Sequence, residues 1–193
     1  MTPDIKNDDA LLIIDVQEAF RLMNAEGMFP SNPTAIINIS LIIKSYRKSG
    51  KKIIHIRHFS KNPQSKFRPD KLGYRVLPEA QELSSEQVIV KRENSAFIGT
   101  ELEEILRVHG IINLTIVGAT TNHCVETTAR MAANLGFRVV VVADATWCYG
   151  LIEPDGTVFP AKLLHAVSIA NLRAEFADIQ TTQNILQMND SYL

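Results

Sequence analysis

Short, continuous runs of apolar residues, rich in valine and isoleucine, alternate along the chain with segments of helical periodicity. Runs that are apolar at successive positions, rather than at every second one, are typical of parallel strands covered on both faces. We therefore expect six strands. They are predicted over residues 10–16, 52–57, 87–91, 114–118, 138–143 and, shorter, 178–181.

Four helices are predicted between and after these strands. The first has Asn32 as its N-cap and Pro33 as its first helical residue, and the second begins with a capping-box pattern at Thr100 and Glu103. Glycines that follow three of the segments mark their ends. The helices are predicted over residues 32–50, 100–110, 122–135 and 161–176.

The regular alternation of strand and helix predicts an α/β protein. Right-handed crossovers place helices on both faces of the sheet, which makes a three-layer α/β/α sandwich with a mostly parallel, Rossmann-like sheet of about six strands in the order 3-2-1-4-5-6. No repeat or linker divides the sequence, so one domain is expected over residues 1–193. The basic stretch at residues 59–73 is expected to be a long surface loop, either a cover for a functional site or a solvated excursion.

Composition narrows the classes of partner and compartment. Lys and Arg (20) nearly balance Asp and Glu (21), and the net charge of −1 indicates neither a nucleic acid nor a membrane surface as partner. The first apolar run, residues 10–14, is far too short for a membrane span or a secretory signal, so we expect a soluble, cytoplasmic protein. Two cysteines without a C-x-x-C pair exclude a disulfide framework, and the question becomes whether either thiol is a nucleophile.

Three chemically active side chains stand at predicted strand ends, where ligands bind in open α/β sheets. Asp15 ends the first strand, Lys91 ends the third, and Cys124 lies where the loop after the fourth becomes a helix. Each residue alone has a structural explanation, as a cap, a solvated strand end or a small core residue. Together they fit a cysteine nucleophile, because the helix terminus and the lysine favour the thiolate and the aspartate can accept the thiol proton.

The segments around these residues resemble the isochorismatase-like cysteine hydrolases. The resemblance spans nearly the whole chain, through ALLIIDVQEAF, IVKRENSAFIGTELEEIL and LTIVGATTNHCVETTARMAANLGFRVVVVADAT. It implies a catalytic triad of Asp15, Lys91 and Cys124. It also implies a cis peptide bond between Ala119 and Thr120 and an oxyanion hole made by the backbone N–H groups of Thr120 and Cys124. The run TTNHCVETTARMAANLGF, with NSAF after the lysine, is similar to members described as generic cysteine hydrolases or as similar to streptothricin hydrolase.

Nicotinamidase members of this family bind a metal through an Asp-x-His pair and a further histidine after the second strand. Here His58 follows that strand, but Ile56 stands where the aspartate would be, and the loop beyond holds no second histidine. We therefore expect no metal, and the lack of a G-x-G-x-x-G or P-loop pattern predicts no nucleotide or other cofactor. The expected substrate-pocket residues are Gln17, Phe20, His58, Phe97, Asn122 and Trp147.

Other polar residues compete with the triad. His123 adjoins the cysteine, but adjacent helical residues point about 100° apart, so it is expected to line the pocket or contact a neighbouring subunit rather than to act as the base. Asp144, after the fifth strand, competes with Asp15 as base, although an aspartate there is also a common turn residue. Cys148 is expected to be structural, and its aromatic neighbours either wall the pocket or pack internally.

The sequence thus predicts an enzyme that hydrolyses a C–N bond of a small amide, lactam or ureide through a covalent thioester. Asp15 takes the Cys124 proton, the thiolate attacks the carbonyl carbon, and Lys91 steadies the charges. Two alternatives remain: vinyl-ether hydrolysis of the isochorismate type, and a small-ligand binder on the same fold that performs no catalysis. The resemblance also implies a homo-oligomer, either a dimer or a tetramer.

Overall fold

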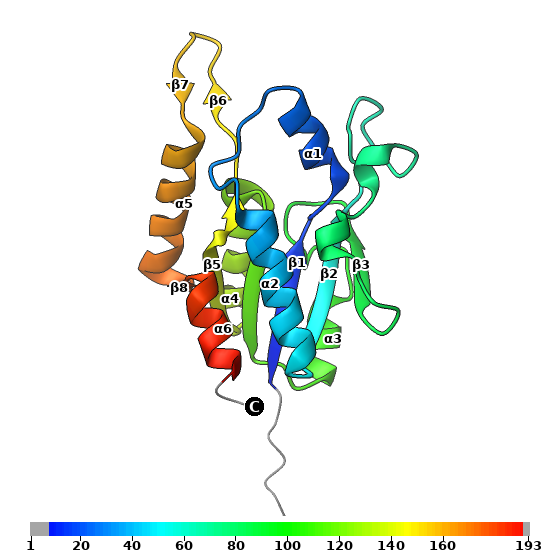
Figure 1. Ribbon diagram of the computed structural model, residues 1–193. Helices are drawn as coiled ribbons and strands as arrows, with labels where there is room; N and C mark the ends of the chain where they lie inside the picture. Colours follow the sequence, from blue (N-terminus) through cyan, green and yellow to red (C-terminus); the bar gives the residue numbers. More distant parts are fainter. Residues whose placement is uncertain (1–7, 191–193) are drawn as a thin grey trace, which may run out of the picture.

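A computed structural model describes residues 8–190. At its centre is a six-stranded sheet with the order β3-β2-β1-β4-β5-β8 and parallel pairing throughout (Figure 1). The predicted α/β class and strand order are confirmed, because the sixth strand expected from the sequence is the one labelled β8. The strands are β1 (Asp9–Ile14), β2 (Lys52–His58), β3 (Gln87–Lys91), β4 (Asn113–Ala119), β5 (Arg138–Trp147) and β8 (Asp178–Gln180).

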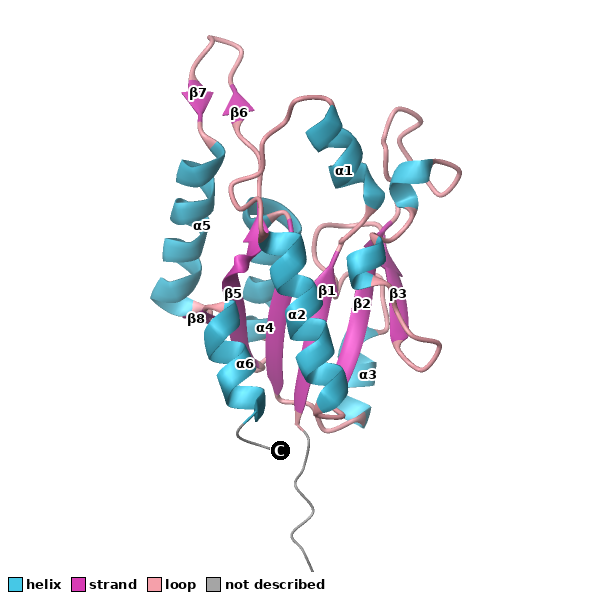
Figure 2. Ribbon diagram, viewed as in Figure 1, coloured by secondary structure: helices cyan, strands magenta, loops and turns pink. Residues whose placement is uncertain are grey.

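Helices cover both faces of the sheet, which gives the three layers seen in Figure 2. They are α1 (Glu18–Ala25), α2 (Ala35–Lys48), α3 (Leu102–Val108), α4 (Glu126–Asn134), α5 (Ala161–Glu175) and α6 (Thr182–Asp190). Along β1, Leu12 and Ile14 pack in the layer of α3, α4 and α5, whereas Leu11 and Ile13 pack in the layer of α1, α2 and α6. Because successive side chains of a strand point to opposite faces, a strand between two helical layers must be apolar at every position.

The helix predicted to open at Asn32 begins later, at Ala35. The Asn32 side-chain amide does not cap the helix. It donates to the carbonyl oxygens of Ala143, at 2.9 Å, and Thr146, at 2.6 Å, and so holds the preceding loop against β5. An asparagine that satisfies distant backbone carbonyls is not available as a cap, and this tertiary contact overrides the local signal.

The predicted capping box at Thr100 and Glu103 is also wrong, and α3 begins at Leu102. The Thr100 hydroxyl donates to the Ala96 carbonyl oxygen at 2.5 Å, in the turn before the helix. Glu103 forms an ion pair with Arg107, one turn further along. Both side chains therefore have partners outside the reciprocal pair that the motif requires.

The single helix expected over residues 122–135 is divided into a π-helical turn over Thr121–Val125 and then α4. Besides two 3₁₀-helical turns, Leu72–Tyr74 and Pro78–Ala80, four short elements were not expected from the sequence. Their few residues carry too little periodicity to be distinguished from loops. They are α1, α6 and the strands β6 (Leu151–Ile152) and β7 (Val158–Phe159), which form a separate antiparallel hairpin.

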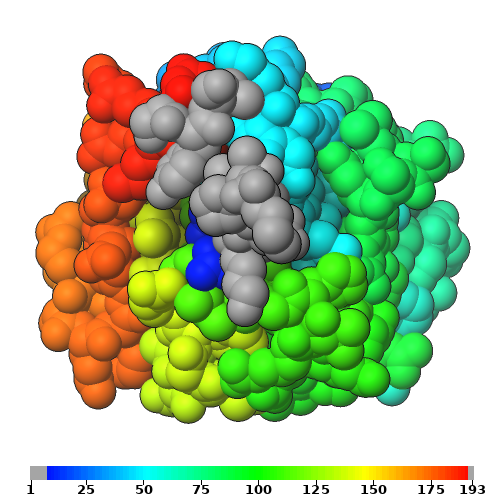
Figure 3. Space-filling view, turned by 90° about the horizontal axis from the view of Figure 1, so that it is seen from below, coloured from blue at the N-terminus to red at the C-terminus, as the bar shows by residue number. Residues whose placement is uncertain are grey.

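The carboxyl ends of the parallel strands meet at one end of the molecule, where α1 and the β6–β7 hairpin also lie (Figure 1). Figure 3 looks at the opposite end, where α6 and the segment between α2 and β2 lie around the start of β1. Between residues 8 and 190, no helix combines the length and the apolar character needed to cross a bilayer.

Candidate active site

Asp15 follows β1 in a backbone conformation that aspartate seldom adopts. Its φ angle is +52°, and its N–H donates to the Ile56 carbonyl oxygen at 2.9 Å. Beside it, Gly118 of β4 has a φ angle of +117°, and a Cβ atom there would stand 2.0 Å from the Ile14 carbonyl oxygen. Only glycine fits that contact, so β1 and β4 approach closely at their ends. The turn in the chain at Asp15 is thus fixed from both neighbouring strands.

Lys91 is the last residue of β3 and is almost completely buried, with 1% of its surface exposed. Its Nζ atom lies 2.8 Å from Oδ2 of Asp15 and donates to Sγ of Cys124 at 3.3 Å. The same ammonium group donates to the Glu93 carbonyl oxygen at 3.1 Å and lies 3.4 Å from Nδ1 of His58. The structure therefore brings together the three side chains that the sequence placed at separate strand ends.

Cys124 lies in the π-helical turn that follows β4. The carbonyl oxygen of Thr120 accepts the N–H groups of both His123, at 3.1 Å, and Val125, at 3.2 Å, which tightens the turn around the cysteine. The peptide bond between Ala119 and Thr120 is cis, as the resemblance implied. The thiol is half-buried, and its sulfur atom faces Lys91 on one side and a pocket on the other.

Burial dominates the electrostatics of both reactive groups. Burial raises the pKa of Asp15, although the nearby Lys91 charge opposes this change. Burial and then the Asp15 charge raise the pKa of the Cys124 thiol to about 12, again against the influence of Lys91. Lys91 acts in the expected direction, towards the thiolate, but loss of solvent outweighs it. The resting thiol keeps its proton and needs a base.

One oxygen of the Asp15 carboxylate is in a position to serve as that base. Oδ2 is held by Lys91, whereas Oδ1 is buried and makes no hydrogen bond of good geometry with any described residue. The carboxylate and the Cys124 thiol are close enough for each to affect the pKa of the other. An acceptor without a partner beside a protonated thiol is what proton transfer from sulfur requires.

A pocket of about 280 Å³ opens in front of the cysteine. Three of the six residues expected to form it do so: Phe20, His58 and Asn122. His123 also lines it, as one of its two predicted roles required. His58 is partly buried, and burial together with the Lys91 charge lowers its pKa, so its ring is neutral at neutral pH. The pocket thus contains the thiol, two histidines and amide side chains.

The other three expected pocket residues are structural. Gln17 is buried, and its side chain donates to the carbonyl oxygens of His58 and Tyr74 and accepts the His58 N–H, so it links loops beneath the site. Phe97 belongs to the core and stacks on Phe137 at 6.0 Å. Trp147 is buried behind Phe20, with ring centroids 5.3 Å apart. Each of these three residues follows a motif residue in the sequence, but its side chain points away from the pocket.

Much of the pocket wall comes from residues that were not among the six expected ones. These wall residues are apolar or aromatic and surround the mouth. They are Met23, Met28, Phe67, Tyr149 and Leu151. The loop at residues 59–73 is a cover rather than an excursion, because Phe67 packs against Phe20 at 5.2 Å and His58 at 5.5 Å. The available signal for the pocket wall was the aromatic residues that follow the motifs. Tyr149 is one of the two aromatic neighbours of Cys148 that were expected either to wall the pocket or to pack internally.

The competing candidates have structural roles. Cys148 is fully buried, and its Sγ atom donates to the Ala161 carbonyl oxygen at 3.3 Å. Asp144 accepts both the N–H and the hydroxyl of Thr182 through Oδ1, each at 2.8 Å, so it caps α6. Neither lies in the pocket with Cys124. Among residues 8–190, no three His, Cys, Asp or Glu side chains are grouped closely enough to hold a metal ion.

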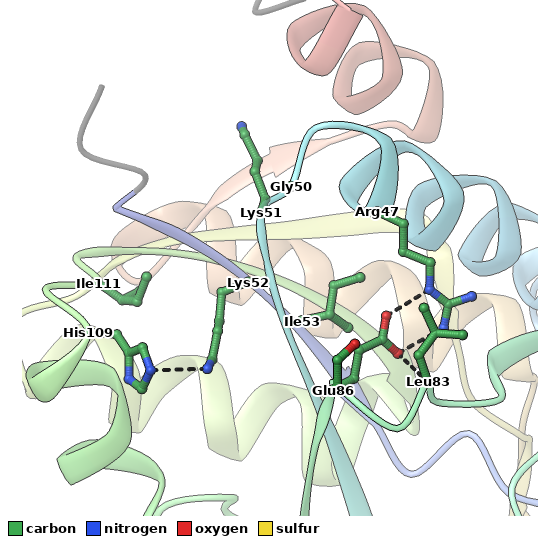
Figure 4. A pocket seen from close by; sticks show the side chains of 10 residues that line it. Arg47, Gly50, Lys51, Lys52, Ile53, Leu83, Glu86, His109 and Ile111 are labelled. Carbon is green, nitrogen blue, oxygen red and sulfur yellow. Dashed lines mark hydrogen bonds and ion pairs between the residues drawn. The ribbon is translucent and has the colours of Figure 1, made fainter. Parts of the chain in front are cut away.

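A second hollow, of about 390 Å³, lies near the amino ends of β2 and β3 (Figure 4). Its charged side chains face one another: Arg47 donates to Glu86, and Lys52 lies 3.2 Å from His109. No cysteine lines it. This hollow therefore lacks the cysteine thiol that lines the pocket at the carboxyl end of the sheet.

Comparison with known proteins agrees with this site. The family model of the Isochorismatase domain matches residues 9–184. The isochorismatase family protein YrdC of Bacillus subtilis is 40% identical over 177 residues, which cover 92% of this chain and 94% of that protein. The crystal structure of a hydrolase of the isochorismatase family from Chromobacterium violaceum has a TM-score of 0.89 and 35% identity, and covers 96% of this chain and 95% of its own.

Two further relatives have named activities. Streptothricin hydrolase of Streptomyces noursei is 30% identical over 147 residues, which cover 76% of this chain and 52% of that protein. The ureidoacrylate amidohydrolase RutB of Acinetobacter baylyi is 33% identical over 113 residues, which cover 58% and 42%. The family model spans nearly all the described residues, including Asp15, Lys91 and Cys124. The chain belongs to the isochorismatase family, a family of hydrolases that includes amidohydrolases.

Proposed function

We propose that this protein is a cysteine hydrolase that cleaves a non-peptide C–N bond of a small molecule through a covalent thioester. The observation that carries the proposal is the position of the Lys91 ammonium group, 2.8 Å from Asp15 and 3.3 Å from Cys124. A buried cation between them stabilises negative charge on either group, so a proton can pass from sulfur to carboxylate without leaving an unpaired charge. The amidohydrolase among the relatives supports a C–N bond as the target.

In the first half of the reaction, Asp15 removes the proton from Sγ of Cys124. The sulfur bonds to the carbonyl carbon of the substrate, and the π electron pair moves to the carbonyl oxygen. The backbone N–H groups of Thr120 and Cys124 donate to this oxyanion. The C–N bond then breaks, the nitrogen takes the proton held by Asp15, and the amine leaves an acyl thioester on the cysteine.

In the second half, the ionised Asp15 takes a proton from water while the water oxygen bonds to the thioester carbon. The tetrahedral intermediate collapses with rupture of the C–S bond, and Cys124 leaves as a thiolate beside Lys91. The proton on Asp15 returns to the sulfur, which restores the resting site. The sum is one amide and one water converted to one carboxylic acid and one amine.

The raised pKa values suit these roles. A carboxyl group whose pKa is raised by burial is a stronger base than an ordinary aspartate, and a thiol that keeps its proton at rest depends on that base. Substrate binding removes more water from the pocket and places the carbonyl carbon next to the sulfur. Proton transfer is then coupled to attack rather than completed beforehand.

The test is to detect the acyl-enzyme. Wild-type protein is incubated with a panel of small amides, lactams, ureides and carbamoyl compounds, and with isochorismate, then quenched in acid and examined by intact-mass spectrometry. We expect a mass increase equal to the acyl group, and release of the matching acid and amine, for at least one C–N compound. Neither product nor adduct is expected with Cys124→Ala.

Three results would overturn the proposal. Turnover by Cys124→Ala would exclude the nucleophile. Product from isochorismate alone would indicate vinyl-ether hydrolysis. Saturable binding of panel compounds without adduct or product would indicate a binder that has kept the fold.

A further inference from the structure

The pocket in front of Cys124 has no cation available for a substrate. None of the described residues that line it is a lysine or an arginine. Lys91 lies behind the wall, fully buried, and its charge faces Asp15. His58, the histidine nearest that pair, has its pKa lowered by burial and by the Lys91 charge. An anionic group on a substrate would therefore lose water on entry without gaining a counter-charge.

The charged side chains near the mouth of the pocket either have a partner within the protein or lie outside the pocket. Lys66, on the covering loop, forms an ion pair with Glu26 at 2.8 Å. Glu93 is exposed and does not line the pocket. Arg92 is exposed as well, with its guanidinium 5.0 Å from the ring centre of Phe59. No carboxylate other than Asp15 lines the interior, so a cationic substituent also lacks a partner there.

The rest of the wall is apolar and partly adaptable. Phe20, Phe67 and Tyr149 form a cluster in which Phe20 meets Phe67 edge-on at 5.2 Å and stacks with Tyr149 at 6.1 Å. Met23 and Met28 add flexible thioether side chains, which fill irregular gaps and contact aromatic rings favourably. A cavity of about 280 Å³ is small among ligand sites, so it admits a compact substituent.

We propose that the substrate of this site is an uncharged amide-type compound whose substituent is apolar, either a flat ring or a short alkyl chain, and that carboxylate-bearing and amine-bearing amides are excluded. This inference rests on the proposed function, because it takes the scissile carbonyl to lie at Cys124. A pocket that lacks counter-charges selects against charged substrates without any direct contact to the charged group that it rejects.

Binding to the Cys124→Ala protein tests the inference separately from turnover. The ligands are phenylacetamide and pentanamide, which are neutral, succinamate, which is anionic, and 4-aminobutanamide, which is cationic. Dissociation constants are measured by NMR titration at pH 8, where an imidazole of ordinary pKa is uncharged. We expect both neutral amides to bind at least about 10-fold more tightly than either charged one, because a buried charge without a partner is costly.

A charge placed on the wall should reverse part of this preference, and β6 offers a matched pair of positions. Leu151 lines the pocket and is 43% exposed, while its neighbour Ile152 is 75% exposed and does not line it. Adjacent residues of a strand point to opposite sides. The two side chains therefore leave the same part of the chain in different directions, and only that of Leu151 faces the pocket. In the Cys124→Ala background, Leu151→Arg should strengthen succinamate binding about 5-fold or more, and Ile152→Arg should leave it unchanged.

Each outcome is decisive. Binding of succinamate or 4-aminobutanamide as tight as that of the neutral amides would overturn the inference, as would equal effects of Leu151→Arg and Ile152→Arg. If neutral amides bind selectively but wild-type protein forms neither acyl-enzyme nor product from any panel compound, the pocket inference stands and the hydrolase proposal fails. If charged amides are the ones hydrolysed, the hydrolase proposal stands and the pocket inference fails.

Discussion

A carboxylate lies next to a cationic side chain at each end of the sheet, but the two carboxylates accept different numbers of hydrogen bonds. Near the amino ends of β2 and β3, Glu86 accepts two hydrogen bonds from Arg47, at 2.7 and 2.8 Å, and one each from His55 and the Leu83 N–H, both at 2.9 Å. At the carboxyl ends, Asp15 is held through one oxygen, and its other oxygen has no hydrogen-bond partner among the described residues.

The opposite pKa shifts follow from this difference and from the deeper burial of Asp15. Burial alone would raise the pKa of Glu86, but the hydrogen bonds from Arg47, Leu83 and His55 outweigh burial and lower it to about 2. For Asp15, burial prevails over Lys91 and the smaller influences of His58 and Cys124, and the pKa is raised. A fully satisfied carboxylate stays ionised and stabilises the fold, whereas an incompletely satisfied one is able to take a proton. The number of hydrogen-bond donors and the depth of burial together, rather than the presence of an ion pair, distinguish the two carboxylates.

The largest effect should come from the sulfur atom. Cys124→Ala and Cys124→Ser should each reduce turnover about 10⁴-fold or more, since an alanine has no nucleophile and a serine hydroxyl is far harder to deprotonate. The free energy of unfolding should change by at most about 2 kcal/mol. Steady-state assays and thermal melts measure the two effects. Cys148→Ala is the control and should keep most of the activity, because Cys148 is buried away from the pocket; an inactive Cys148→Ala beside an active Cys124→Ala would refute the assignment.

The buried ion pair of Asp15 and Lys91 should affect both the stability of the fold and the activity. Lys91→Met should lower stability by about 3–5 kcal/mol, because it leaves the Asp15 carboxylate buried without its cation. The double variant Asp15→Asn/Lys91→Met should recover most of that stability, since neither charge remains, yet stay inactive because the base is gone. Chemical denaturation with activity assays on both variants provides the measurement. Recovery of activity together with stability would show that the pair is structural, like Glu86 at the other end.

A smaller effect, confined to stability, is expected at the amino end. Glu86→Gln should lower the free energy of unfolding by about 1–3 kcal/mol, because charge-assisted hydrogen bonds to Arg47 and His55 are lost. In a chain of this length that corresponds to a melting temperature lower by about 2–10 °C. The ratio kcat/KM should stay within about 2-fold. Glu104→Gln, at an exposed position of α3, is the matched control and should shift stability by less than about 0.5 kcal/mol. A loss of activity in Glu86→Gln would break the distinction between the two ends.

The smallest expected effect is the change with pH of the stability that Glu86 contributes. Because the pKa of Glu86 is lowered to about 2 from an ordinary value of 4.5, its contribution to stability is complete above pH 4.5 and is lost as the pH falls from 4.5 towards 2. The stability difference between wild type and Glu86→Gln should therefore shrink over that window. Denaturant unfolding of both proteins at pH 6 and pH 3 measures it. A difference that is the same at the two pH values would mean that the carboxylate is not held in its ionised form.

The sequence predicted the sheet and the convergence of Asp15, Lys91 and Cys124 well because both depend on short-range signals. Continuous apolar runs locate parallel strands, and the strand-end rule then places Asp15, Lys91 and Cys124 at one edge without any knowledge of side-chain contacts. The bounds of β3 agree to the residue, and the other five differ at their ends by between one and four residues. The size of the rise in the pKa of the thiol could not be predicted, because it depends on how much solvent the folded site excludes.

The pocket wall was predicted less well because neighbours in sequence need not share a face. Phe97 and Trp147 follow motif residues but turn into the core, while Met28 and Phe67 lie in segments without periodicity and reach the pocket through tertiary packing. The N-cap expected at Asn32 failed for the same reason, since its partners on β5 are more than 100 residues away in the chain. Long-range contacts of this kind have no local signal.

The central position of β1 has a consequence for how the chain matures during synthesis. Its two neighbours come from very different distances along the chain: β2 begins at Lys52, after α1 and α2, whereas the partner of Ile14 on the other side is Gly118. At about 5–20 residues per second, the ribosome needs on the order of 5 to 20 seconds to make the intervening chain. During that time an apolar strand with one unpaired edge is exposed, which favours pairing with other nascent chains. The strand that leads into Asp15 therefore keeps one apolar edge open until β4 emerges.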